Sequence, residues 1–254
     1  MTAATEIERL LATWPRTRPP LSPAHEKVYA EEYKKTRNDG AAEQPLVSRL
    51  AAYVSEWMHR KIVAVQVPGA VLEIGAGTLN HLPFEPPLPA YDIVEPFTHL
   101  FEDSPRKSSL RTIYPDIRSI PMESRYGRIL SVAVLEHLTE LPFAVAKSGL
   151  MLQEGGVFQA GIPGEGGFLW GTAWRMSTGI AYRLRTGLDY KTLMRHEHIN
   201  TAREIVAVVQ HLFADVKIRH FPLPFIHGSL FLYIEARQPR LDICREVITK
   251  GIRM

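Results

Sequence analysis

The stretch Val71-Leu-Glu-Ile-Gly-Ala-Gly-Thr-Leu-Asn80 decides how the rest of the chain is organised. A short apolar run stops at two glycines, Gly75 and Gly77, which is typical of a buried parallel strand entering a tight turn. Glycine lets the backbone adopt a positive φ and lets a ligand approach the main chain. In open α/β sheets small molecules bind beyond the carboxyl ends of the strands. The stretch therefore predicts a ligand-binding turn after the first strand.

The composition indicates a globular protein without a specialised surface. The chain has 254 residues, of which 45% are apolar and 22% charged, and this is compatible with one α/β domain plus additions. Its formal charge is +3, and the basic residues are scattered, so we expect no nucleic-acid partner. No apolar run approaches the roughly 18 residues of a membrane span. The chain is thus expected to bind small molecules.

The compartment is predicted from the first residues and from one cysteine. The N-terminus lacks the basic start and apolar core of a secretory signal. Cys244 is the only cysteine, which excludes an intramolecular disulfide and suits a reducing environment. We therefore expect a cytoplasmic protein.

Two classes of cofactor compete for the turn. A dinucleotide fingerprint would place a third glycine at position 80, where this chain has Asn80. Glu73 stands two residues before the first glycine, and Glu-x-Gly-x-Gly after an apolar strand resembles motif I of the class I methyltransferases, which use S-adenosylmethionine. Further marks of that family are Leu-Glu-His-Leu at 135–138 and the Gly155-Gly156 pair. The resemblance covers about residues 66–236.

The resemblance implies an α/β fold, a Rossmann-like seven-stranded and mostly parallel sheet with helices on both faces. Sequence patterns predict strands at 71–74, 91–95, 110–114, 126–134, 157–162, 216–221 and 229–236, the last antiparallel. Helices are expected at 25–37, 46–65, 96–103, 139–153, 201–211 and 239–254. The capping box Thr201-Ala-Arg-Glu204 marks one helix start. Residues 1–65 would form an N-terminal helical cap on a methyltransferase domain at 66–254.

The cofactor residues follow from the same arrangement. Glu95 closes the second strand 18 positions after Gly77, where a carboxylate beside the turn can accept both hydroxyls of a ribose. An acid and an apolar residue after strand three, Asp116 and Ile117, match the family's adenine contacts. The candidate S-adenosylmethionine site is Glu73, Gly75, Ala76, Gly77, Glu95, Pro96, Asp116, Ile117 and Val134.

Histidines are the candidates for catalysis. Methyl transfer from a sulfonium requires an in-line arrangement, and an oxygen or nitrogen acceptor that carries a proton needs a base. His137 follows strand four and His198 ends the insertion, and both have a side chain suited to proton transfer near neutral pH. A structural role bonded to backbone remains open for His137. If 195–200 is extended, His196 and His198 point the same way.

Residues 163–200 fit no standard α/β repeat and are rich in glycine and aromatic residues, so we expect a lid and acceptor pocket there. The candidate substrate residues are Tyr29, Tyr33, Trp170 and His196, with simple packing as the alternative for the tyrosines. Arg37 is a further candidate. Some family members hold a metal with Glu-x-x-Glu-His after strand four, but Ala133 replaces the first carboxylate, so we expect no metal.

The sequence therefore predicts an S-adenosylmethionine-dependent methyltransferase that acts on an oxygen or nitrogen of a small-molecule acceptor. Two alternatives remain open: a noncatalytic module that binds the same cofactor, and an NAD-linked oxidoreductase, against which position 80 argues.

Overall fold

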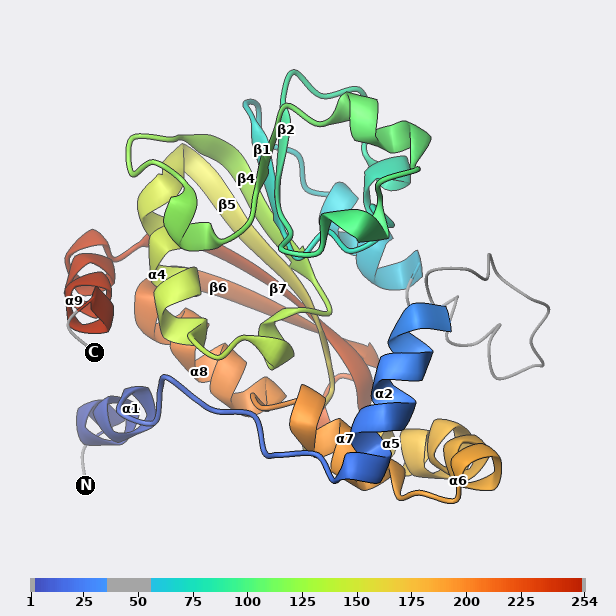
Figure 1. Ribbon diagram of the computed structural model, residues 1–254. Coiled ribbons are helices and arrows are strands. Elements are labelled where there is room, and N and C mark those ends of the chain that lie inside the picture. Colours follow the sequence, from blue (N-terminus) through green and yellow to red (C-terminus); the bar gives the residue numbers. More distant parts are fainter. Residues whose placement is uncertain (1–2, 36–55, 253–254) are drawn as a thin grey trace.

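The computed structural model describes residues 3–35 and 56–252, and a seven-stranded sheet forms its centre (Figure 1). The strand order is β3-β2-β1-β4-β5-β7-β6. Only β7 runs antiparallel to its neighbours, which confirms the predicted mostly parallel sheet and its reversed strand. The strands are β1 Val71–Ile74, β2 Tyr91–Val94, β3 Thr112–Tyr114, β4 Tyr126–Val132, β5 Leu152–Pro163, β6 Phe213–Pro222 and β7 Ser229–Pro239.

Alternation along the strands gives the sheet two buried faces. Leu72 and Ile74 of β1 join a core with three helices, namely α4 Leu141–Met151, α8 Ala202–Leu212 and α9 Leu241–Ile252. Val71 joins a second core that contains Ile62, from a helix at residues 56–63. Helices therefore cover both faces, as predicted.

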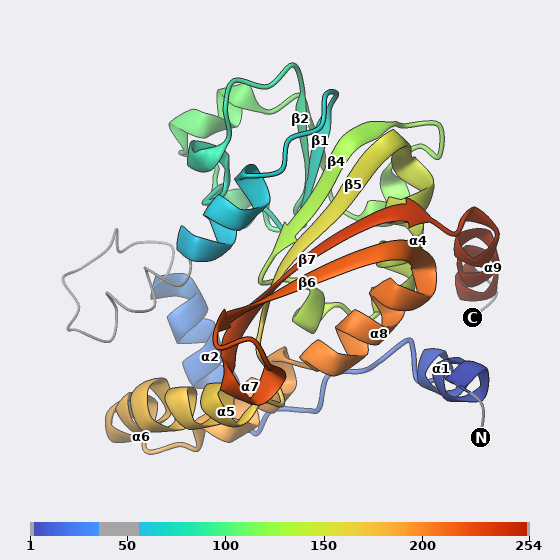
Figure 2. The same ribbon diagram turned by 180° about the vertical axis from the view of Figure 1, so that it is seen from behind.

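The N-terminal segment runs along the molecule rather than standing apart from it. Helix α1, Ala3–Leu11, lies near α8 and α9, and α2, Pro23–Lys35, lies beside the helices of the insertion (Figures 1 and 2). Trp14 Nε1 donates to Asn200 Oδ1 at 3.0 Å, and His25 Nε2 lies 2.9 Å from the carbonyl oxygen of Asp189. Arg16 pairs with Glu204 at 2.6 Å. These contacts tie residues 12–25 to the start of α8 and to the insertion.

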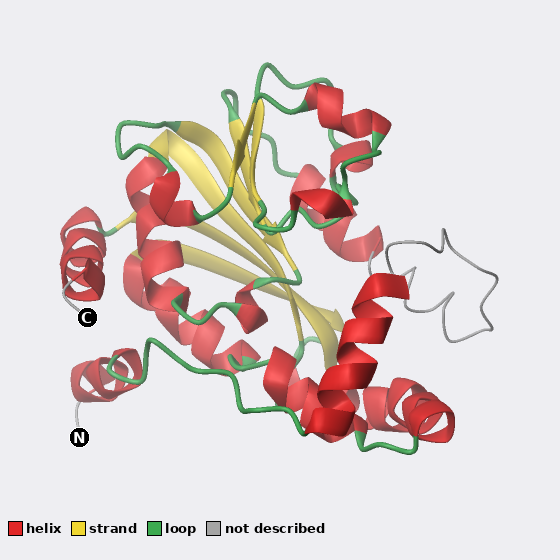
Figure 3. Cartoon of the chain, in the orientation of Figure 1, coloured by secondary structure: helices red, strands yellow, loops and turns green. Residues whose placement is uncertain are grey.

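The insertion between β5 and α8 is helical (Figure 3). It contains α5 Phe168–Trp174, a π-helical turn η6 Arg175–Gly179, α6 Ile180–Thr186 and α7 Tyr190–Glu197. The expectation of an extended stretch around His196 and His198 is wrong, because α7 continues to Glu197 and His198 is its C-cap.

Several predicted boundaries change for local reasons. The predicted helix at 96–103 is wrong: only short 3-10 turns, η2 Thr98–Leu100 and η3 Pro105–Ser109, precede β3. Strand four stops at Val132 because Ala133 takes a φ of +53°, which a strand does not accommodate. The predicted helix at 46–65 is described only over residues 56–63, and Arg37 lies outside the described residues.

Within the described part of the chain, no helix is long and apolar enough to cross a membrane.

Candidate functional site

The two glycines of the turn after β1 have different surroundings. Gly75 has a φ of +74° and Gly77 a φ of +51°, a region that favours glycine. A Cβ on Gly75 would lie 2.4 Å from Val134 Cγ2, so the side chain of Val134 already fills the space at this glycine. A Cβ on Gly77 would meet no atom of residues 3–35 or 56–252 within 4 Å. The open side of the turn is therefore at Gly77.

The carboxylate of Glu95 connects the end of β2 to that turn. Its Oε2 accepts the Gly77 N–H at 2.8 Å, and its Oε1 accepts the Phe97 N–H at 3.0 Å. Glu95 is buried, whereas the neighbouring Phe97 ring is 49% exposed. Each carboxylate oxygen has a second lone pair, so Glu95 can accept further hydrogen bonds from a ligand.

No α-helix follows the turn. After Gly77 the chain passes through Leu79, whose φ is +62°, and reaches only the 3-10 turn η1 Leu82–Phe84 before β2. Dinucleotide sites place the pyrophosphate at the N-terminus of a helix that starts here. Residues 75–90 are all described, and they lack that helix. The turn thus has the glycines of a nucleoside site without the anion site of a dinucleotide fold.

A buried polar network holds the loop between β1 and β2. Glu85 bonds to both terminal nitrogens of Arg128 at 2.8 Å, and these side chains are almost fully buried. His81 Nε2 lies 2.8 Å from Glu85 Oε1, and His81 Nδ1 lies 2.9 Å from His59 Nδ1. The network joins the loop to β4 and to the helix at 56–63. Because breaking a buried charge pair on one side is costly, this network favours the observed conformation of the loop.

Glu73 lies inside the protein rather than at the open side of the turn. Its Oε2 accepts a hydrogen bond from Tyr91 Oη at 2.8 Å, and burial raises the pKa of its carboxyl to about 7. Ala76 is likewise buried. Their cofactor roles remain predictions.

The other predicted cofactor residues differ in their exposure to solvent. Pro96 is exposed beside Glu95. Asp116 is exposed, and its Oδ1 accepts the Arg118 N–H at 2.6 Å, while Ile117 packs into the core. The structure leaves the carboxylate of Asp116 accessible on a short 3-10 turn, η4 Ile117–Ser119.

The two candidate catalytic histidines lie together. The rings of His137 and His198 meet edge to face, with centroids 4.8 Å apart. His137 Nδ1 lies 2.8 Å from the carbonyl oxygen of Glu197, so this nitrogen carries the proton and donates it. The Nε2 of a neutral His137 is then free to accept a proton. His198 Nδ1 lies 2.6 Å from Glu165 Oε2.

Their surroundings shift the two pKa values in opposite directions. Burial, with the charge of His198, lowers the pKa of His137. Burial also opposes charge on His198, but the hydrogen bond and charge of Glu165 outweigh it and raise the pKa of His198. A pair of titratable groups pushed apart in this way is typical of an acid and a base in one site.

Glu136 lies beneath this pair. It is 1% exposed, and burial raises the pKa of its carboxyl to about 7. Its Oε1 is 3.8 Å from His137 Nε2, and its Oε2 is buried with no hydrogen-bond partner among the described residues. A charged carboxylate oxygen that is buried without a partner is unfavourable, so these surroundings favour the protonated form of Glu136 beside His137.

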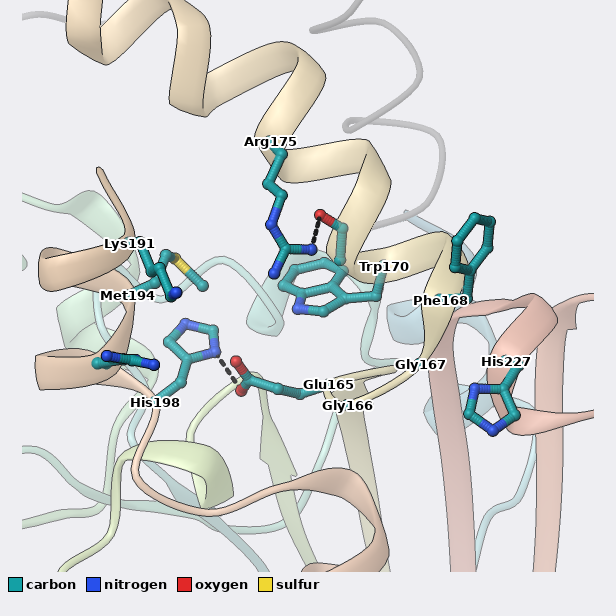
Figure 4. Close-up of a pocket in the computed structure, with 12 residues that line it drawn as sticks. Glu165, Gly166, Gly167, Phe168, Trp170, Arg175, Lys191, Met194, His198 and His227 are labelled. Atoms are coloured by element: carbon teal, nitrogen blue, oxygen red, sulfur yellow. Dashed lines mark hydrogen bonds and ion pairs between the residues drawn. The ribbon is translucent and has the colours of Figure 1, made fainter. Parts of the chain in front are cut away.

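A pocket of about 530 Å³ opens beside His198 (Figure 4). Trp170, Arg175, His198 and Glu165 converge on it, and Lys191 and Met194 line the α7 side. The insertion thus supplies most of the lining, and Trp170, a predicted substrate residue, is part of it.

Two other predicted substrate residues, His196 and Tyr29, do not line this pocket. His196 Nδ1 lies 2.7 Å from the carbonyl oxygen of Pro19, and its ring meets that of Tyr29 at 5.8 Å. His196 therefore contacts the N-terminal segment. Tyr33 belongs to α2, but its side chain lies outside the described residues.

Sequence reasoning missed Glu165 and Glu197. Glu165 follows β5 directly, where strand ends face the site, and this position was the available signal. Glu197 reaches Arg18 at 3.1 Å and His137 Nδ1 at 3.5 Å, contacts that depend on the fold of α7.

Among residues 3–35 and 56–252, no group of three or more His, Cys, Asp or Glu side chains is arranged to hold a metal ion.

Comparison with known proteins places the fold. The N-methyltransferase NodS from Bradyrhizobium japonicum, in complex with S-adenosyl-L-homocysteine, is similar over 83% of this chain and 98% of its own, at 13% identity and a TM-score of 0.56. A possible histamine N-methyltransferase from Thermotoga maritima covers 83% and 96%, at 16% identity and a TM-score of 0.55. The CurJ carbon methyltransferase has 20% identity and a TM-score of 0.50, and the match spans 54% of its length and 72% of this chain.

No family model and no curated protein matches the sequence. At these identities the similarity defines the fold: the chain has the Rossmann-like α/β fold of the S-adenosylmethionine-dependent methyltransferases.

Proposed function

We propose that this protein binds S-adenosylmethionine and transfers its methyl group to a small-molecule acceptor. The observation that carries the proposal is the bridge from Glu95 to the Gly77 N–H, beside open space where a side chain on Gly77 would stand. The fold and the S-adenosyl-L-homocysteine bound to NodS support it.

The chain's own residues fit such a cofactor. The free lone pairs of Glu95 would accept the ribose hydroxyls, and the exposed ring of Phe97 provides an apolar surface next to them. Asp116 and Ile117 keep their proposed place at the adenine. The missing helix after the turn matters little, since this cofactor has no pyrophosphate. When bound, it supplies an electrophilic methyl group on a sulfonium.

His137 and His198 would together remove the proton of the acceptor and stabilise the charge that develops. His137 Nε2, with its lowered pKa, is neutral near pH 7 and is the proposed base. His198, held by Glu165, favours the charged form and would stabilise negative charge next to the acceptor. The acceptor would occupy the pocket at Trp170, whose volume is in the range for small molecules.

The noncatalytic module is the second candidate. It would need the cofactor site but not the paired histidines, and the opposite pKa shifts of His137 and His198 favour an enzyme.

Cys244 is a buried free thiol, which supports a reducing compartment such as the cytoplasm as the proposed location.

The test uses methyl-labelled S-adenosylmethionine and the small-molecule fraction of a cell extract. We expect a labelled product of low mass, and His137→Gln should slow its formation by about 10²-fold or more without weakening S-adenosylhomocysteine binding. Cofactor binding with no labelled product would instead favour the noncatalytic module. Label in macromolecules alone would contradict a small acceptor.

A further inference from the structure

The pocket beside His198 has an unbalanced charge. Arg175 comes from the turn after α5, and Lys191 and Arg195 come from α7. Among the described residues that line it, the only carboxylate is that of Glu165, which His198 engages at 2.6 Å. Asp189, at the start of α7, accepts the Lys191 N–H at 3.1 Å as the helix cap. Among the described lining residues, Arg175, Lys191 and Arg195 therefore outnumber the carboxylate of Glu165.

The positive charges of Lys191 and Arg195, both on α7, repel one another. Lys191 and Arg195 are four residues apart on one helix, so their side chains are neighbours, and like charges at this spacing destabilise a helix. Both side chains are exposed, and among the described residues neither has a hydrogen bond or ion pair. A bound anion would relieve this repulsion.

The pocket also offers a buried donor without an acceptor. The indole Nε1 of Trp170 is buried and has no hydrogen-bond partner in the described part of the structure. Figure 4 shows this nitrogen on the side of Trp170 that faces Arg175 and His198. A buried N–H left unpaired is unfavourable by about 1–3 kcal/mol, and a ligand oxygen would satisfy it. The indole and the side chain of Met194 add apolar walls.

We propose, on the basis of the function proposed above, that the acceptor is an organic oxyanion: a carboxylate or phosphate on an apolar, ring-bearing body. Lys191 and Arg195 bind the oxyanion, with Arg175 adding charge at the opposite wall. Trp170 donates its indole N–H to the same ligand and packs on its ring. The acceptor's nucleophilic atom then lies on the side of His198 and His137.

Binding is tested on the full chain saturated with S-adenosylhomocysteine, by calorimetry with benzoate, phenyl phosphate and the neutral isostere benzamide. We expect both anions to bind at least about tenfold more tightly than benzamide, and added NaCl to weaken them. The tighter of the two anions identifies the acidic group. Affinities for benzoate and phenyl phosphate that are both no higher than that for benzamide would overturn the proposal.

Variants assign the contacts. Lys191→Gln and Arg195→Gln, both at exposed helical positions, should each weaken anion binding by about three- to tenfold. Trp170→Phe keeps a ring, removes the donor and should have a similar effect. Lys107→Gln, an exposed lysine on η3, is the matched control and should leave binding unchanged. Anion affinity that is unchanged in both α7 variants would refute the assignment.

The two proposals fail separately. If S-adenosylhomocysteine does not bind, the proposed function fails, and the same anion titrations on the unliganded protein still measure the charge preference of the pocket. If it binds and labelled methyl is transferred while anions show no preference over benzamide, only the oxyanion proposal fails.

Discussion

The Nδ1 atom of His198 lies 2.6 Å from Oε2 of Glu165, a hydrogen bond between the C-cap of α7 and the first residues after β5. It brings the end of a core strand and the end of the insertion into one site. It also helps to raise the pKa of His198, which burial alone would lower. Glu165 is thus a positioning residue with an electrostatic effect.

Replacing Glu165 with glutamine should lower the pKa of His198, which is raised in the wild type. The reason is that burial remains while the neutral amide removes the stabilising charge. A pH titration of the ring resonances by NMR measures the shift. Glu154→Gln, at an exposed position, serves as the control. An unchanged His198 pKa in Glu165→Gln would show that other groups hold the charge.

Glu136→Gln should stabilise the protein increasingly as the pH rises. Burial raises the native pKa of Glu136 from 4.5 to about 7, so the native state holds this proton more tightly than the unfolded chain does. Its contribution to stability is complete below about pH 4.5 and is lost as the pH rises through about 7. Glutamine has no charge to bury, so the variant should gain up to about 3 kcal/mol over the wild type at pH 8.

Urea unfolding at pH 4.5, 6 and 8 measures this difference in the free energy of unfolding, again with Glu154→Gln as the exposed control. A difference between Glu136→Gln and the wild type that does not grow with pH would mean that Glu136 stays ionised without cost in the native protein.

The two glycines of the turn should respond differently to alanine. Gly75→Ala puts a Cβ 2.4 Å from Val134 and strains a φ of +74°, so we expect a loss of about 2–4 kcal/mol in unfolding free energy. Gly77→Ala strains φ but clashes with nothing, so about 1 kcal/mol is expected. Thermal unfolding compares them. Equal losses would contradict the packing of Val134 on Gly75.

The main strands and the turn of this fold could be predicted because local sequence patterns indicate them. The apolar run before Gly75, the acid at Glu95 and the capping box at Thr201 and Glu204 each appear in the structure where predicted. These features depend on neighbouring residues and on the order of the elements along the chain, both of which can be read from a single sequence.

Contacts between distant segments were not predictable in the same way. Arg128 was part of a mostly apolar predicted strand, and its buried pair with Glu85 bridges 43 positions. The helical state of α7 was missed because alternating histidines suggested an extended chain, while the Asp189 cap and the buried Leu193 and Met194 favour a helix. The pairing of Glu165 with His198 follows only once α7 is placed.

The central claim is that the bend at Gly77 and the carboxylate of Glu95 hold an adenosine. Titration calorimetry with S-adenosylhomocysteine tests it most directly, with NAD as the competing ligand and Glu123→Ala, an exposed acid between β3 and β4, as the control variant. Circular dichroism checks the fold of Glu95→Ala. We expect the wild type and Glu123→Ala to bind S-adenosylhomocysteine but not NAD, and Glu95→Ala to bind at least about thirtyfold more weakly. Unchanged affinity in a folded Glu95→Ala, or preference for NAD, would contradict the account.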